Sequence, residues 1–497
     1  MQIFISGATG LLGRALSAHL LGRGHAVTAW VRDPVRAEAA LGPDVARVTT
    51  RDTAGLEGAI SSADAVVHLA GAPIVGKRWT ASRKRELIAS RVDTARTLAA
   101  AIRARPRPLP VLVSASAVGY YGDRGDEELA ESAPRGQGFA AELCEQWEQA
   151  ALEVGQAASR VVCARIGIVL ARNAGALGPL GRLARLGLAG PISKGTQWVP
   201  WIHLDDVVRA LTLMIEDTAL SGPVNVVGPA PVRQRELASA LGRSVDRPAF
   251  VPAPRLALRV ILGEAAAVLV ASQRVLPIAL ERAGFAFRFA TLDAALDDVM
   301  RDHGVEIRAV SRAELPQASY FERRTARYVL SVTTTIDRPL SAVLPFFADA
   351  QNLSVLTPPW LEFAITTPRP IVMNAGATID YQIKLSGIPL TWRTVIERWE
   401  PTRGFVDAQH GGPYEAWWHE HRFRADGDRT LMEDVVYYAP RFGLLGRIAN
   451  RLFVARQLRA IFAYRGHAIR LRFGSRDDAQ RAVPVRAERS PALTTLH

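Results

Sequence analysis

The chain begins with the stretch IFISGATGLLG, residues 3–13. Its first three residues form a short apolar run typical of a buried strand, and three glycines follow at G-x-x-G-x-x-G spacing, Gly7, Gly10 and Gly13. A helical pattern then continues to residue 23. Glycines permit a tight turn and let backbone N–H groups approach a pyrophosphate, whose charge the N-terminus of a helix favours. The stretch therefore predicts a strand, a turn and a helix that together hold a dinucleotide.

Strand and helix patterns alternate outward from this stretch. Apolar runs at 26–31, 65–69 and 111–114 have the length of strands. Between the last two, the apolar residues of 81–102 recur at steps of three and four, as on one face of a long helix. Such alternation predicts a parallel sheet covered by helices on both faces. We expect an α/β fold, a doubly wound Rossmann sheet, with a small substrate lobe formed by the looser segment after residue 169.

The pattern changes near residue 306. Residues 306–325 are charged and read as a linker, strand-like runs dominate from Tyr328 onward, and 447–471 has the periodicity of one long amphipathic helix. This predicts an α+β cup in which antiparallel strands close on the helix. The expected parts are a Rossmann domain at 1–305 that folds without the second domain, a linker at 306–325, a second domain at 326–474 and a disordered tail at 475–497.

Composition narrows the classes of partner and compartment. The 497 residues carry a formal net charge of +13, but only four of the 61 basic residues are lysines, and the arginines are scattered. We expect no nucleic-acid partner, because such proteins cluster their basic residues on one face. Cys144 and Cys163 lack metal-ligand spacing and indicate reduced thiols. No apolar stretch reaches the roughly 18–20 residues of a membrane-spanning helix and no signal-peptide pattern is present, so we expect a cytoplasmic protein without integral membrane association. The oligomeric state stays open.

The end of the second predicted strand indicates which dinucleotide binds. Arg32 and Asp33 follow this strand directly. An acidic residue there favours the free 2′-hydroxyl of NAD, whereas an arginine accommodates the 2′-phosphate of NADP. Because Arg32 is the first residue past the strand, we predict NADP(H), and Asp33 keeps NAD(H) open as the less favoured alternative.

Further segments make residues 1–305 similar to a known family. They are SGATGLLG (6–13), LAGAPI (69–74), KRW (77–79), SRV (90–92), SASAVGYYG (114–122), GLAGPI (187–192), WIHLDD (201–206) and GFAF (284–287). Together they resemble the atypical extended short-chain dehydrogenase/reductases. The resemblance is to the epimerase-family group of class 39U, some of whose bacterial members have been labelled cell-division inhibitors.

The resemblance implies cofactor contacts beyond the three glycines and Arg32. The positions that match are Thr9, Leu11, Leu12, Leu69, Ala70, Gly71, Glu86, Arg91, Ser114 and Arg165. Taken alone, Glu86 and Arg91 fit the solvated face of a helix, so their assignment depends on the resemblance.

The catalytic residues of this superfamily are only partly present. Short-chain reductases use a serine that orients the substrate, a tyrosine that transfers the proton and a lysine that lowers the pKa of the tyrosine. Ser116 matches the serine. Phe139 and Leu143 occupy the positions where the Tyr-x-x-x-Lys pair is expected. Phe139 cannot transfer a proton, and Leu143 cannot lower the pKa of a proton donor. The standard mechanism is therefore in doubt.

Other residues could supply the proton. Tyr120 and Tyr121 lie shortly after the serine, His203 has a pKa suited to neutral pH, and Glu142 is a weaker candidate. Each has a structural alternative, since the tyrosines can pack the turn and WIHLDD can be a turn that caps a helix at Asp205. The expected catalytic set is Ser116, Tyr121 and His203.

The second domain is similar to the START-like superfamily of helix-grip domains, of the polyketide-cyclase kind. IDRPL (336–340), GGPY (411–414), WWHEH (417–421) and the long last helix carry this resemblance, which implies an apolar cavity. His419 and His421 are two residues apart on one strand and share a face. With Glu415 or Glu433 they could bind a metal, but a polar outer face is the favoured interpretation, so no metal is expected.

Two functions remain in competition. The first is an NADP(H)-dependent oxidoreductase or epimerase whose second domain holds a small apolar substrate. The second is a regulator that senses NADP(H) without catalysis, since the Tyr-x-x-x-Lys pair is missing.

Overall fold

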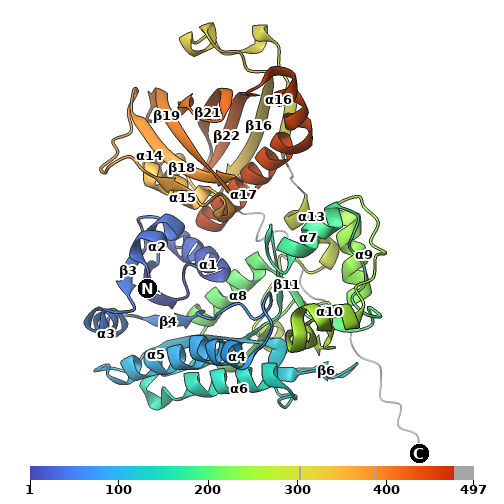
Figure 1. Cartoon of the computed structure of the whole chain (residues 1–497). Coiled ribbons are helices and arrows are strands. Elements are labelled where there is room, and N and C mark those ends of the chain that lie inside the picture. Colours follow the sequence, from blue (N-terminus) through green and yellow to red (C-terminus); the bar gives the residue numbers. More distant parts are fainter. Residues whose placement is uncertain (302–303, 386, 475–497) are drawn as a thin grey trace, which may run out of the picture.

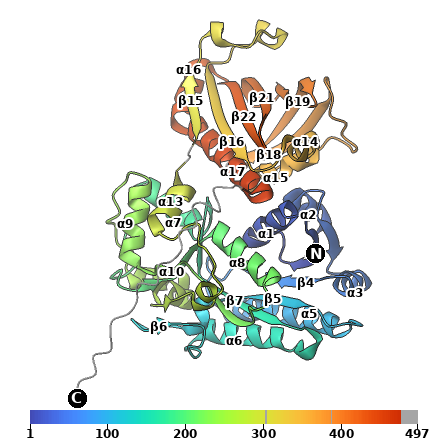
Figure 2. The ribbon, with the colours of Figure 1, turned by 180° about the vertical axis from the view of Figure 1, so that it is seen from behind.

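The structure is a computed structural model that describes residues 1–301, 304–385 and 387–474. It has two domains, the first coloured blue to green and the second yellow to red (Figure 1). The view from behind shows the last helix of the second domain facing the first domain (Figure 2). The predicted tail, 475–497, lies outside the described residues.

The first domain is built on a seven-stranded sheet whose neighbouring strands are all parallel. In spatial order the strands are β12 (Gly222–Val226), β7 (Val161–Ile166), β5 (Val111–Ala117), β4 (Ala65–His68), β1 (Gln2–Ser6), β2 (Ala26–Val31) and β3 (Ala46–Thr49). The chain runs from β1 to β3 on one side and then returns to β4 on the other, which opens a crevice at the carboxyl ends of β1 and β4. The predicted doubly wound Rossmann sheet is confirmed.

Helices cover both faces of this sheet, because its strands are apolar on both sides. Ile5 of β1 packs in the core on one face and Phe4 in the core on the other. The first face carries α1 (Leu11–Gly22), α2 (Pro34–Leu41) and α8 (Leu204–Glu216), and the second carries α3 (Thr53–Ser61), α5 (Thr94–Arg103) and α6 (Phe139–Leu152). The sheet is therefore a middle layer that leaves its carboxyl edge for binding.

Both long helices predicted from the sequence contain one π-helical turn. The helix expected over 81–102 consists of α4 (Ala81–Ile88), the turn Ala89–Asp93 and α5. The helix expected over 447–471 consists of α16 (Gly443–Ala449), the turn Asn450–Val454 and α17 (Ala455–Phe473). An extra residue in a helical turn shifts the apolar face that follows it.

A smaller lobe with its own apolar core flanks the sheet near β12. It contains β8 (Ile168–Ala171), β11 (Trp201–His203), α7 (Leu177–Arg185), α9 (Gln234–Ser244) and α13 (Leu292–Met300). This lobe occupies the place predicted for the substrate lobe.

The second domain is an eight-stranded antiparallel sheet gripping one long helix, as the α+β prediction required. In spatial order the strands are β15 (Val305–Ala309), β16 (Tyr328–Ile336), β22 (Arg429–Pro440), β21 (Tyr414–Asp426), β20 (Gly404–Gly411), β19 (Ile388–Glu400), β18 (Thr378–Leu385) and β17 (Ala364–Ile365). Helix α17 packs on the inner face of the sheet, where Leu458 and Phe462 join the buried side chains of β16, β21 and β22.

The stretch 306–325 is not the linker that the sequence predicted. Strand β15 pairs with β16 at the edge of the sheet, and Tyr320 and Phe321 are buried against Trp418 on its outer face. The charged residues that suggested a linker are exposed between these anchors. The second domain therefore begins at β15.

The domains meet along α17 and α1. A Cβ on Gly22 of α1 would lie 1.7 Å from the carbonyl oxygen of Arg472, so the two helix ends touch backbone to backbone. Arg472 also pairs with Asp44 of the first domain at 2.6 Å. Among the described residues, no helix is both long enough and apolar enough to cross a bilayer.

Candidate functional site

The glycine-rich turn lies between β1 and α1 at the carboxyl edge of the parallel sheet. Gly7 has a φ of +76°, and a Cβ there would lie 2.6 Å from the backbone of Leu69 and Ala70. Helix α1 follows Gly10, which offers no side chain to cap it. The N–H groups of Leu11 and Leu12 in its first turn are therefore available to an anion.

Arg32 and Asp33, the two candidates for contact with the adenosine ribose, have different surroundings at the end of β2. One carboxylate oxygen of Asp33 accepts hydrogen bonds from the N–H groups of Val35 and Arg36, both at 3.1 Å, and so caps α2. Arg32 is exposed beside it. Asp33 therefore caps α2, whereas the Arg32 side chain is exposed and can face solvent or a ligand.

Two residues implied as cofactor contacts on the long helix behave differently. Arg91 is buried, donates to the carbonyl of Ala72 at 2.9 Å and stacks over Trp147. It thereby holds the loop that contains Gly71, whose Cβ would lie 3.0 Å from its guanidinium carbon. Glu86 keeps an exposed carboxylate that pairs with Arg83 at 2.6 Å, which lowers the pKa of Glu86. Glu86 therefore fits the solvated helix face.

A buried, neutral histidine, His68, lies at the carboxyl edge of the parallel sheet. His68, at the end of β4, is buried, its Nδ1 lies 2.7 Å from the hydroxyl of Ser6 and its Nε2 lies 3.2 Å from the carbonyl of Arg91. The carbonyl can only accept, so Nε2 donates and Nδ1 accepts. Burial lowers the pKa of His68 to about 4.

We expect this histidine to make the first domain acid-sensitive. The unfolded chain takes up a proton near pH 6.5, whereas the folded chain resists protonation down to about pH 4. Stability is therefore lost as pH falls through this window, by about 3 kcal/mol in total. Unfolding measured at several pH values should show a loss about 3 kcal/mol larger in the parent than in His68→Gln, since His467, whose pKa burial also lowers to about 4, contributes to both. Parallel stability curves between pH 6.5 and 4 would contradict the assignment.

Ser116 and Tyr121 belong to one buried polar network, the Glu148 network, formed by Ser116, Tyr121, Glu148, Arg165 and Asn225. Ser116 Oγ donates to Glu148 Oε1 at 2.7 Å, and Arg165 binds both carboxylate oxygens, at 2.8 and 2.9 Å. Arg165 also donates to the Tyr121 hydroxyl at 2.9 Å, which in turn donates to Asn225 at 2.7 Å. The structure thus brings two predicted catalytic residues together through a carboxylate and a guanidinium.

This network constrains what its members can do. Tyr121 is fully buried and its hydroxyl is already used as donor and acceptor, and burial raises its pKa. To protonate a substrate it would first have to leave the network. Arg165, implied as a cofactor contact, is buried in the ion pair with Glu148. Sequence reasoning missed Glu148, although it lies four residues after buried Cys144 on the apolar face of α6.

The positions of the missing Tyr and Lys are apolar in space as well as in sequence. Leu143 is buried in a cluster with Trp79 and Leu87. Phe139 packs edge-on against the Trp79 ring, with 5.0 Å between centroids. Trp79 and Leu87 cannot replace the missing proton donor, and the nearby Lys84, 4.9 Å from the centroid of the Phe139 ring, pairs with Glu264 at 2.7 Å.

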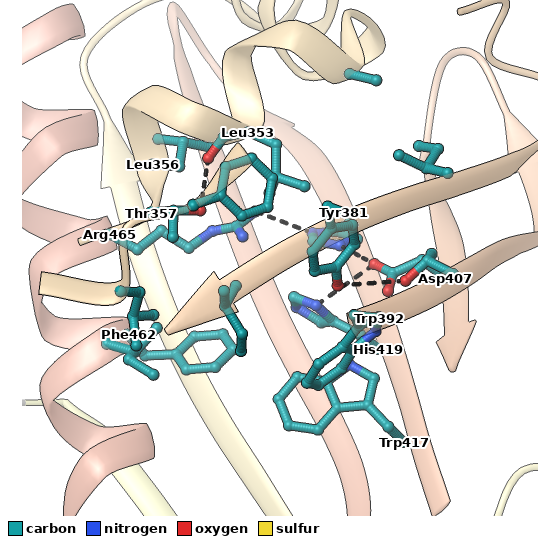
Figure 3. A pocket seen from close by; sticks show the side chains of 18 of the residues that line it. Leu353, Leu356, Thr357, Tyr381, Trp392, Asp407, Trp417, His419, Phe462 and Arg465 are labelled. Carbon is teal, nitrogen blue, oxygen red and sulfur yellow. Dashed lines mark hydrogen bonds and ion pairs between the residues drawn. The ribbon is translucent and has the colours of Figure 1, made fainter. Parts of the chain in front are cut away.

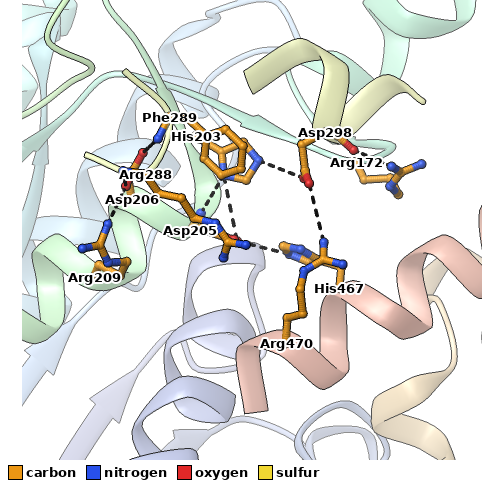
Figure 4. A network of polar contacts seen from close by, with 10 residues as sticks. All are labelled: Arg172, His203, Asp205, Asp206, Arg209, Arg288, Phe289, Asp298, His467 and Arg470. Carbon is orange, nitrogen blue, oxygen red and sulfur yellow. Dashed lines mark hydrogen bonds and ion pairs between the residues drawn. The ribbon is translucent and has the colours of Figure 1, made fainter. Parts of the chain in front are cut away.

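His203 lies apart from the Glu148 network, at the interface between the domains (Figure 4). It caps α8, since its Nδ1 accepts from the N–H of Asp205 at 3.1 Å. The predicted cap at Asp205 is therefore wrong by two residues, because the imidazole reaches this N–H itself. Its ring stacks on Phe289 at 3.8 Å. His203 is fully buried, so the capping alternative fits it better than a donor role.

Polar contacts extend from His203 to the second domain (Figure 4). Asp298 lies 3.4 Å from His203 Nε2 and 3.6 Å from Arg470 of α17. Asp205 lies 3.6 Å from His467 of the same helix, whose pKa burial lowers to about 4. These groups hold α17 against the lobe. Because His203 belongs to this interface and Ser116 and Tyr121 belong to the Glu148 network, the three predicted catalytic residues do not form one site.

The second domain contains a largely apolar cavity of about 280 Å³ between its sheet and α17 (Figure 3). Trp392 and Trp417 line it, together with Tyr381. His419 and His421 also line it and are buried. The favoured interpretation of a polar outer face is therefore wrong for both histidines. The outer face of β21 is occupied by Trp418, beneath Tyr320 and Phe321, which leaves the histidine face inward.

Comparisons with known proteins match the first domain. A family model described as the NAD dependent epimerase/dehydratase family matches residues 3–228, and one described as a domain of unknown function, DUF1731, matches residues 253–299. An epimerase family protein of Mycobacterium leprae is 40% identical over 297 residues, which are 59% of this chain and 94% of that protein. The human epimerase family protein SDR39U1 is 36% identical over 304 residues, which are 60% of this chain and 100% of that protein. A crystal structure of human SDR39U1 (isoform 2) with NADPH covers 60% of this chain and 99% of its own, at 34% identity and a TM-score of 0.55.

Proposed function

The chain belongs to the epimerase family, and from that premise we propose that its first domain binds NADP(H) and acts on a small apolar molecule that the second domain helps to hold. One observation carries the cofactor preference. Arg32 is exposed at the end of β2 while Asp33 caps α2, which favours a 2′-phosphate over a free hydroxyl. The human relative crystallised with NADPH supports the same choice.

The second domain supports the apolar substrate. We assign it to the START-like helix-grip domains, on its sheet order and on the largely apolar cavity between the sheet and α17. A further hollow of about 370 Å³ lies between the domains, lined by Leu11 of the glycine-rich turn and by Trp360 and Tyr464 of the second domain. A ligand held near α17 would therefore be close to the dinucleotide turn.

A specific observation also favours a second function, an NADP(H)-sensing regulator. Phe139 and Leu143 form part of an apolar cluster, and Tyr121 is locked in the Glu148 network. Incubation with NADPH and a panel of apolar ketones, enones and quinones separates the two functions. Oxidation of NADPH with any of them favours the enzyme, whereas tight NADPH binding without turnover favours the sensor.

Arg32→Ala is expected to weaken NADPH binding about 10–100-fold, the value of a lost charge-assisted hydrogen bond, and to leave NADH binding unchanged. Titration calorimetry with both cofactors measures this. Arg107→Ala is the matched control, because Arg107 is also exposed but precedes β5 at the opposite edge of the sheet. Equal affinity of the parent for NADPH and NADH would remove the basis of the proposal.

A further inference from the structure

Three side chains of the second domain direct ligand atoms at one point on the wall of its cavity. Asp407 lies on β20, opposite His419 of β21 in the register of the sheet, and His421 shares the face of His419. Asp407 Oδ2 is 2.8 Å from His421 Nε2 and 3.5 Å from His419 Nδ1. All three ligand atoms lie within 4.8 Å of one another. Figure 3 shows Asp407 to the right of the Tyr381 ring and His419 below it.

The second nitrogens of both imidazoles contact a different carboxylate. His419 Nε2 and His421 Nδ1 lie 3.0 and 2.8 Å from the same oxygen of Asp434. A carboxylate can only accept, so the contacts with Asp434 place a hydrogen on each of these nitrogens, although the Arg465 guanidinium, which can only donate, also lies 3.2 Å from His421 Nδ1. The lone pairs are then on His419 Nδ1 and His421 Nε2, the nitrogens that face Asp407. Two lone pairs and an anionic oxygen then converge on one point, an arrangement that either a bound cation or a second proton on His421 satisfies.

The 3.5 Å between His419 Nδ1 and Asp407 Oδ2 is the spacing of two ligands on one ion, whereas the 2.8 Å between His421 Nε2 and Asp407 Oδ2 is the length of a hydrogen bond. A proton can bridge one nitrogen to Asp407 but leaves the other lone pair against the carboxylate. Ligand atoms bonded to one ion at about 2.0–2.1 Å in tetrahedral geometry are about 3.4 Å apart, which is close to the spacing of His419 and Asp407. A metal-bound imidazole usually donates its other N–H to a carboxylate, as both rings do here to Asp434.

The charges around the site favour a cation as well. Arg465 of α17 lies 3.2 Å from Asp434 and neutralises it, and its other end lies 3.2 Å from His421 Nδ1. Within the described part of the chain, the two imidazoles are the polar partners of Asp407. The side chain of Asp407 is 16% exposed, and a carboxylate buried to this extent is costly without a compensating positive charge.

We propose that Asp407, His419 and His421 bind a divalent first-row transition-metal ion. Two imidazoles and one carboxylate are a donor set that such ions accept while keeping positions open. All three residues line the apolar cavity, so the open positions face it. The ligand is an apolar molecule with an oxygen that reaches the ion, which polarises that oxygen as a Lewis acid. Sequence spacing could not identify the third ligand, because Asp407 lies on a neighbouring strand. Glu415 and Glu433, the candidates on the sequence, instead pair with arginines.

The test uses the full chain after treatment with a chelator. We expect one Zn²⁺ per chain by titration calorimetry, a higher melting temperature with Zn²⁺, and visible absorption bands when Co²⁺ is bound. Asp407→Asn and His419→Ala should weaken Zn²⁺ binding by more than the about 10–100-fold typical of an outer-shell change. His410→Ala, which removes an exposed histidine from the same strand β20, should bind like the parent.

The proposal has two independent points of failure. It is overturned if the folded parent binds no Zn²⁺ and gives no Co²⁺ spectrum, because a shared proton then suffices for the cluster. It is also overturned if the two ligand variants, shown to be folded by circular dichroism, bind Zn²⁺ as tightly as the parent. Should a variant not fold, the Co²⁺ spectrum of the parent decides the outcome. None of these readouts depends on NADP(H).

Discussion

Glu148→Ala is expected to lower the free energy of unfolding of the first domain by about 3–5 kcal/mol, the cost of removing one partner of a buried ion pair. The carboxylate is bound by Arg165 on both oxygens and by Ser116 on one. Its loss leaves a guanidinium that is 4% exposed without its counter-ion. The Tyr121 hydroxyl, held by the same guanidinium, loses its fixed position as well.

The matched control is one turn away on the same helix. Glu145 pairs with Arg135, but both side chains are about one-third exposed, so Glu145→Ala should cost about 0–1 kcal/mol. Denaturant unfolding followed by circular dichroism compares the two variants with the parent. Because the chain has two domains, it can show two unfolding transitions. The transition that added NADPH shifts belongs to the first domain. Equal costs for the two variants would show that the Glu148 network adds no stability.

The fold of the first domain could be predicted because its signals are local. The strand, the glycine turn and the helix are consecutive in 3–22, and the apolar spacing of each later element is visible within its own residues. The Glu148 network could not be predicted in the same way. It joins residues up to 109 positions apart, from Ser116 to Asn225, and a glutamate on a helix is exposed far more often than buried.

The orientation of β21 was not predictable from its own pattern. Alternation indicates which residues share a face, but it identifies the inner face only when the other face is polar. In β21 both faces carry tryptophan, Trp417 inward and Trp418 outward. The outer face is buried by Tyr320 and Phe321, from the stretch predicted as a linker. Because the sequence predicts 306–325 as a linker, nothing in it indicates that the Trp418 face of β21 is covered. The inward orientation of His419 and His421 could therefore not be recognised.

Gly13→Ala is expected to weaken NADPH binding by at least about 100-fold. A Cβ at this position would lie 2.3 Å from the carbonyl oxygen of Gly7 and 2.5 Å from the Cα of Ala8, roughly 1 Å short of ordinary van der Waals contact. Both neighbours are backbone atoms of the turn, so the turn itself has to move. A displacement of about 1 Å at a binding site is enough for a loss of about 100-fold.

Gly10→Ala separates this effect from the loss of a glycine as such. Its Cβ would lie 3.2 Å from the same carbonyl oxygen of Gly7, a contact that a shift of a few tenths of an ångström relieves. Its unfolding curve should therefore match that of the parent, whereas Gly13→Ala should lose about 1–3 kcal/mol of stability from overpacking. Any loss of NADPH affinity in Gly10→Ala then arises from contact with the cofactor rather than from a distorted turn. If Gly13→Ala binds NADPH within about threefold of the parent, the turn is not the pyrophosphate site, because its amides could not have kept their positions.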